Sequence, residues 1–86
     1  MDKNIILSVI KDYQNSKYIS SEMKVAIDFF LEGIDEIKVE NYDNPFIFVE
    51  DVYCALEDPT ERDLSDFDAK VIDCMNFIAH DIHDLL

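Results

Sequence analysis

The stretch NPFIFVEDVYCALEDPTERDLSDFD, residues 44–68, decides the fold class that we expect. Asn44 suits the N-cap of a helix, and Pro45 suits its first helical position. An apolar run follows and stops at Asp58-Pro59, so the stretch predicts a helix over residues 45–57. At helical spacing, large apolar residues share one side and acids lie roughly opposite. The apolar side consists of Phe46, Val49, Val52, Tyr53 and Leu56.

The end of the same stretch concentrates negative charge around a single base, Arg62. Calcium loops need acids at alternating positions and a glycine for their sharp turn. The alternating positions here are Asp58, Thr60 and Arg62, and no glycine is present, so a calcium site is not expected. A display of carboxylates to a basic partner is favoured over simple solvation. The acids of this cluster are Glu57, Asp58, Glu61, Asp63, Asp66 and Asp68.

Two segments before this stretch have the periodicity of amphipathic helices. Residues 3–14 repeat apolar side chains at helical spacing. Ser20 or Ser21 can then cap a second helix over residues 21–39. Because its apolar side continues beyond Gly33, we expect this helix to pass through the glycine, at a cost of about 1 kcal/mol. The alternative is a helix that stops at Gly33.

A fourth helix is expected over residues 66–84. Its expected apolar side consists of Phe67, Val71, Cys74, Met75, Ile78, Ile82 and Leu85. Ser65 precedes this helix and Asp68 follows three residues later, which is close to a capping box. The length of 86 residues suffices for one small domain, and one glycine and two prolines leave little room for a turn-rich β architecture. The sequence therefore predicts a single all-α domain over residues 1–86, arranged as a small antiparallel four-helix bundle.

The charge of the chain is large and unevenly placed. The chain holds 20 acids and 7 bases, a net charge of −13. Residues 1–27 sum to +1, from three acids and four lysines, whereas residues 28–86 sum to −14, from 17 acids and three bases. Such a field attracts basic partners and raises their association rate. Nucleic acid and anionic membrane surfaces are not expected as ligands, because their phosphates would be repelled.

Two cysteines, Cys54 and Cys74, fit neither a dense disulfide scaffold nor a Cys-x-x-Cys metal or redox motif. Both fall on or beside apolar helix sides, so we expect buried, reduced thiols. The apolar segment 5–10 is too short for a signal peptide, and no stretch approaches the roughly 20 apolar residues of a membrane span. We therefore expect a cytoplasmic protein.

The outer side of the second helix is the main candidate for binding a partner. From Asp28 onward its acids follow one another with no lysine interleaved before Lys38, although mixed charges are the usual surface solution. Phe29 lies on the same side, where an exposed aromatic beside carboxylates suits an interface anchor. The alternatives are an ordinary solvated face and a helix buried on two sides. Together with acids of the third helix and the acidic cluster, the candidates are Asp28, Phe29, Glu32, Asp35, Glu36, Glu50, Asp51, Glu57, Asp58 and Glu61.

Metal binding and catalysis find little support. Asp73, His80 and Asp84 share a strip of the fourth helix near His83, but a metal site needs three or four converging ligands. Surface histidines hydrogen-bonded to neighbouring acids are the simpler interpretation. No glycine-rich phosphate loop, nucleophile elbow or Cys-His signature occurs, and a bundle this short has little room for a catalytic cleft. We expect no enzyme, no cofactor and no metal.

Two segments resemble a known family. The segment NSKYISSEMKVAIDFF, residues 15–30, is similar to the short loop and second-helix entry of colicin D-type immunity proteins. The segment FIFVEDVYCALED, residues 46–58, with the acids and amphipathic helix that follow, is similar to the second half of the same family. The resemblance implies a small acidic helical protein that neutralises a tRNA-cleaving nuclease toxin. It would do so by placing carboxylates where the tRNA phosphates bind in the basic cleft.

We therefore expect an immunity protein that binds a basic nuclease toxin domain, about 1:1 and as a monomer, in a bacteriocin or contact-dependent inhibition system. The alternative is a phage-derived acidic nucleic-acid mimic that inhibits a DNA- or RNA-binding enzyme. An acidic structural subunit and a small hydrolase are the remaining alternatives.

Overall fold

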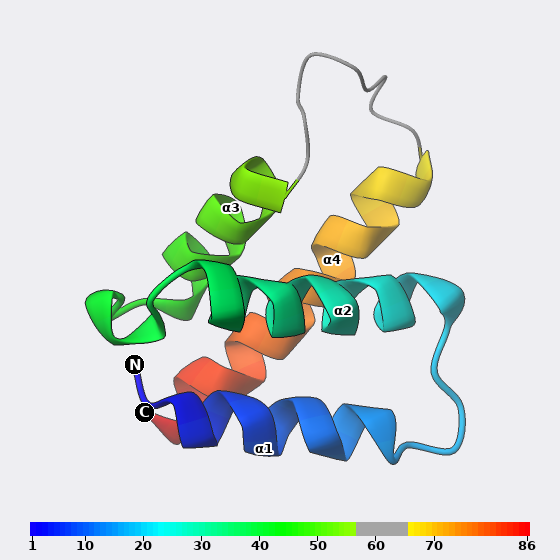
Figure 1. Ribbon diagram of the computed structural model, residues 1–86. Helices are drawn as coiled ribbons and strands as arrows, with labels where there is room; N and C mark the ends of the chain where they lie inside the picture. Colours follow the sequence, from blue (N-terminus) through cyan, green and yellow to red (C-terminus); the bar gives the residue numbers. More distant parts are fainter. Residues whose placement is uncertain (57–65) are drawn as a thin grey trace.

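The computed structural model describes residues 1–56 and 66–86, and these form four α-helices and one 3₁₀ turn, with no strand (Figure 1). The all-α fold class is therefore confirmed for this part of the chain. The elements are α1 (Lys3–Gln14), α2 (Ser21–Glu36), η1 (Val39–Asn41), α3 (Pro45–Leu56) and α4 (Asp66–Leu85).

The helices form two antiparallel pairs that cross each other. In Figure 1, α1 and α2 run in opposite directions, as do α3 and α4, and the second pair crosses the first steeply. Helix α4 contacts each of the other three helices, so it joins the two pairs. A bundle with all four helices aligned antiparallel is not confirmed.

Side chains cap the helix starts that the sequence indicates. The Oγ of Ser20 accepts a hydrogen bond from the backbone N–H of Met23 at 3.1 Å, so Ser20, rather than Ser21, is the N-cap of α2. The Oδ1 of Asn44 accepts from the N–H of Phe46 at 2.9 Å, and α3 begins at Pro45 as predicted. The prediction that Ser65 caps the fourth helix lies outside the described residues.

Helix α2 ends neither near residue 39, as the sequence predicted, nor at Gly33, the alternative. The helix passes through Gly33, as expected, but ends at Glu36 rather than near residue 39. Ile37 is already extended, with φ −118° and ψ 127°, and its N–H donates to the carbonyl of Gly33 at 2.8 Å. Acids in the last turn oppose the helix dipole, which favours an early end. The chain then turns so that Val39 is buried, 1% exposed.

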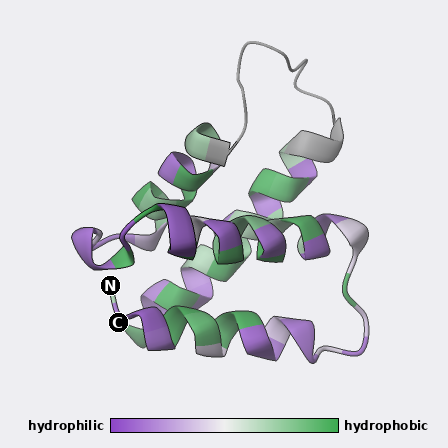
Figure 2. Ribbon diagram, in the orientation of Figure 1, coloured by the Kyte–Doolittle hydropathy of each residue, from purple (hydrophilic) through white to green (hydrophobic). Residues whose placement is uncertain are grey.

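One apolar core joins the four helices. Apolar and polar residues alternate along each helix, as Figure 2 shows by hydropathy, so each helix turns an apolar side inward. The buried apolar residues within the described ranges are Ile6, Val9, Ile10, Ala26, Ile27, Phe30, Ile34, Val39, Phe48, Val49, Val52, Val71, Met75, Ile78, Ala79 and Ile82.

Three details of the predicted core are wrong. Phe48, which the sequence left out of the apolar side of α3, is fully buried, with its ring 5.9 Å from that of Phe30 and 5.2 Å from that of Tyr42. Leu85, expected on the apolar side of α4, is 60% exposed. Cys54 is exposed rather than buried, because the outer side of α3 has no helix over it among the described residues.

Candidate partner-binding surface

The predicted acids of α2 lie together on its outer side. Burial of Ala26 and Phe30 turns the opposite side of this helix to solvent, and the four acids there are all exposed. Within the described residues, none of them forms an ion pair with a lysine. This side of α2 is therefore a strip of carboxylates available to a partner. The acids of the strip are Asp28, Glu32, Asp35 and Glu36.

Helix α3 exposes two further predicted acids, Glu50 and Asp51. The Oδ2 of Asp51 accepts a hydrogen bond from the hydroxyl of Tyr42 at 2.7 Å, and this bond raises the pKa of Tyr42. Asp51 is thus held in place by a neighbour, whereas Glu50 has no such contact within the described part of the chain. The predicted candidates Glu57, Asp58 and Glu61 lie outside the described residues.

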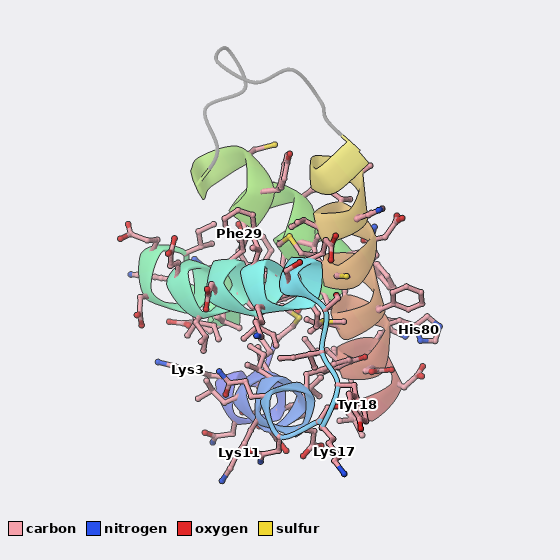
Figure 3. All side chains as sticks on the ribbon, turned by 90° about the vertical axis from the view of Figure 1, so that its right-hand side faces the viewer. Lys3, Lys11, Lys17, Tyr18, Phe29 and His80 are labelled. Carbon is pink, nitrogen blue, oxygen red and sulfur yellow. The ribbon has the colours of Figure 1, made fainter. Side chains whose placement is uncertain are left out.

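Phe29 is half-buried at the junction of α2 and α3 (Figure 3). Its ring stands edge-on to that of Tyr53, with 6.4 Å between ring centres and 82° between planes. Val25, one turn earlier, is also half-buried against the core. Helix α2 is therefore buried on two sides, and only part of the Phe29 ring is open to a partner.

Three of the four lysines in residues 1–27 lie away from these acids, whereas Lys24 lies on α2 itself, one turn before Asp28. Lys3, Lys11 and Lys17 follow α1 and the loop after it, on the far side of the molecule from Phe29 (Figure 3). Most of the positive charge of residues 1–27 is therefore separated in space from the acids of α2 and α3. A basic partner would meet the acidic side of α2 and α3 first.

A groove between α3 and α4 is the feature that sequence reasoning missed. Its larger part, about 750 Å³, is lined by α3 residues between Phe46 and Cys54 and by Ile72 and Asn76 of α4. A smaller part of about 470 Å³ shares Phe46 and Asn76 and extends to Phe77. The two parts are therefore adjoining sections of one groove.

Two large apolar side chains at this groove are exposed, Ile47 at 52% and Phe77 at 65%. The sequence could have indicated that both are exposed, because each lies on the polar side of its helix. Phe77 in particular stands one turn from Asp73 and one turn from Asp81. An apolar side chain in such a place contributes little to folding and suits contact with a partner.

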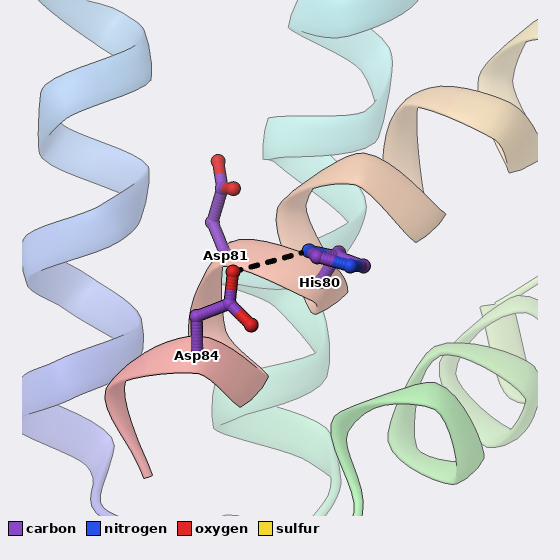
Figure 4. A group of neighbouring side chains, drawn as sticks. All are labelled: His80, Asp81 and Asp84. Atoms are coloured by element: carbon purple, nitrogen blue, oxygen red, sulfur yellow. Dashed lines mark ion pairs between the residues drawn. The ribbon is translucent and has the colours of Figure 1, made fainter.

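Both histidines of α4 lie near Phe46, and His80 also contacts an acid. His80 Nδ1 lies 3.3 Å from the Oδ2 of Asp84, and Asp81 stands beside this pair (Figure 4). One imidazole nitrogen of His80 and one carboxylate oxygen each of Asp81 and Asp84 lie within 4.8 Å of one another, and all three residues are exposed. Asp81 also accepts a hydrogen bond from the hydroxyl of Tyr13 on α1. The ring of Phe46 lies near both histidines, with 6.0 Å between its centre and that of His83 and 6.5 Å between its centre and that of His80.

No helix in the described parts of the chain has the length and apolar content needed to cross a membrane. A scan against protein-family models, a search of curated proteins and a search of solved structures each find no match to the chain.

Proposed function

We propose that this protein is an immunity protein that binds a cognate bacterial nuclease toxin, about 1:1, and occupies its basic cleft with carboxylates. The observation that carries the proposal is the exposed acidic strip of α2, whose members pair with no lysine in the described structure. A nuclease cleft must be basic to hold phosphates, and such a strip complements it in charge. The resemblance of residues 15–30 and 46–58 to colicin D-type immunity proteins supports the same function.

The acids of the strip repel one another and so lower the stability of α2. Asp28 and Glu32, and Glu32 and Glu36, are like charges one turn apart on α2. Each such pair destabilises a helix by about 0.2–0.5 kcal/mol. Residues that reduce stability in this way are typical of surfaces kept for binding. Glu40 does not form a further pair of this kind with Glu36, because α2 ends at Glu36.

The toxin that we propose cleaves tRNA, acts in the cytoplasm and is delivered by a bacteriocin or contact-dependent system. A monomer of this chain would inhibit it by direct contact. Opposite charges would bring the two proteins together quickly, and carboxylates desolvated against arginines of the cleft would hold them.

The test uses the nuclease encoded beside this gene in its host and measures tRNA cleavage and association rate. We expect stoichiometric inhibition, and an association rate that falls at least about tenfold when salt rises from about 0.05 to about 0.5 M. A double variant, Asp28→Asn with Glu32→Gln, should weaken inhibition. The matched control, Asp12→Asn with Asp43→Asn, removes the same net charge from exposed acids outside the strip and should change inhibition little.

Equal weakening by both double variants would show that net charge alone matters. A salt-independent association rate, or no inhibition of any neighbouring nuclease, would contradict the proposed function.

A further inference from the structure

We propose that the groove between α3 and α4 receives a basic amphipathic helix of the partner protein. Its apolar side chains would pack on Phe46, Ile47 and Phe77, and its lysines or arginines would lie against the acids around them. The inference rests on the proposed function for the identity of the partner. The class of segment that the groove binds can be tested without it.

The apolar part of the groove spans two helices. Ile47 of α3 and Phe77 of α4 are both more than half exposed, and half-buried Phe46 lines both parts of the groove between them. An amphipathic helix bound in a groove uses side chains spaced one turn apart, which requires such a continuous apolar floor. Exposed aromatic and aliphatic residues beside a concave surface are the usual centre of a binding site.

The charge around this floor determines the kind of partner. Glu50 and Asp51 line the groove from α3, and Asp73 and Asp81 line it from α4. Among the described residues, no lysine or arginine lines either part. An apolar floor with acids on both walls complements a helix whose apolar side is bordered by basic residues.

A second copy of this chain does not fit the groove equally well. Each copy carries a net charge of −13, so two copies would bring like charges together over the same surface. Juxtaposed like charges oppose association, whereas a basic partner gains from the same acids. Glu50 and Asp51 also belong to the predicted partner-binding residues, so the groove extends that surface rather than replacing it.

The direct test uses a synthetic helical peptide of about 18 residues, with leucines at helical spacing and lysines elsewhere. The control peptide has the same composition in scrambled order, and so the same charge. The readout is alkylation of the exposed thiol of Cys54, which lines the groove, followed by mass spectrometry. The half-buried Cys74 lies outside both parts of the groove and serves as the internal reference. We expect saturating helical peptide to slow Cys54 alkylation at least about tenfold, and the scrambled peptide to have little effect.

Variants then locate the contact. Ile47→Ser and Phe77→Ser should each weaken peptide binding about tenfold, because each removes an apolar contact at the groove. Tyr18→Ser is the matched control, since Tyr18 is 87% exposed on the loop between α1 and α2 and lines neither part of the groove. Equal weakening by Tyr18→Ser, or binding that leaves Cys54 unprotected, would overturn the inference. So would dimers of the chain that Phe77→Ser dissociates.

The nuclease assay separates this inference from the proposed function. If Phe77→Ser inhibits the nuclease as well as the parent and the peptide does not protect Cys54, the groove inference fails and the immunity function stands. If the peptide protects Cys54 but no neighbouring nuclease is inhibited, the proposed function fails and the groove remains a site for a basic helix.

Discussion

Gly33 of α2 lies directly against Val52 of α3. A Cβ added to Gly33 would stand 2.5 Å from Cγ2 of Val52, closer than two carbon atoms approach in proteins. The φ of Gly33 is negative, so glycine is not required for the backbone conformation. It is required for the close approach of two crossing helices, and this explains why α2 continues through a residue that weakens it.

Gly33→Ala should therefore destabilise the protein. Alanine would gain about 1 kcal/mol in helix propensity, but its methyl group would collide with a valine that is fully buried and stiff about χ1. Overpacking of this kind costs about 1–3 kcal/mol, so we expect a net loss of stability in urea unfolding. The double variant with Val52→Ala should recover part of the loss, with a coupling of about 0.5–3 kcal/mol. Additive effects would show that the two residues do not compete for the same space.

Ser20→Ala should lower stability by about 1 kcal/mol, because it leaves the N–H of Met23 without its cap. For a domain of this size that corresponds to a fall in melting temperature of about 4–8 °C. Ser21→Ala is the matched control, since the Ser21 hydroxyl contacts only the exposed carboxylate of Glu22. If the melting temperature fell equally in Ser20→Ala and Ser21→Ala, Ser20 would not be the N-cap.

Glu32→Gln should raise stability and weaken association with a basic partner. The change removes two like-charge pairs on α2, with Asp28 and with Glu36, and each is worth about 0.2–0.5 kcal/mol. Chemical unfolding and association kinetics measure the two effects. Asp12→Asn removes an exposed acid with no charged residue one turn away, and should change neither quantity appreciably. If Glu32→Gln changed neither stability nor binding, the acidic strip would be an ordinary solvated surface with no role in binding.

Stability should fall in alkali partly through Tyr13. Burial raises the pKa of Tyr13 from 10.0 to about 12, with the hydrogen bond to Asp81 as the second cause. Because the folded pKa lies above the unfolded one, this contribution is complete below pH 10 and is lost as pH rises from about 10 to about 12. Tyr13→Phe should therefore lose less stability over that range than the parent.

Asp81→Asn tests the two causes of this pKa. It removes the charge beside the phenol but not the burial, so its loss between pH 10 and 12 should lie between those of the parent and Tyr13→Phe. Absorbance of tyrosinate on titration gives the pKa itself. If the parent, Tyr13→Phe and Asp81→Asn all lost the same stability between about pH 10 and about pH 12, the role of Tyr13 would be contradicted.

Several features of the molecule followed from local sequence alone. The period of apolar residues placed four helices, and the caps at Ser20 and Asn44 follow from side chains that reach only two or three residues along the chain. The exposed strip at Asp28 and Glu32 follows from the same period, because an apolar side inward leaves the acids outward. Each of these depends on neighbours within one or two helical turns.

Only the tertiary structure decided the rest, because it depends on which helices meet. Phe48 is buried by Phe30 and Tyr42, which precede it in the chain but meet it only when α2 and η1 pack on α3. The groove joins Phe46 to Phe77 across two helices, and no period within either helix encodes that contact. From the sequence, Gly33 was expected only to weaken α2, but in the structure it allows α2 to pack directly against Val52 of α3. The sequence determined which side of each helix is apolar, whereas the packing determined how the helices cross and which residues they leave open between them.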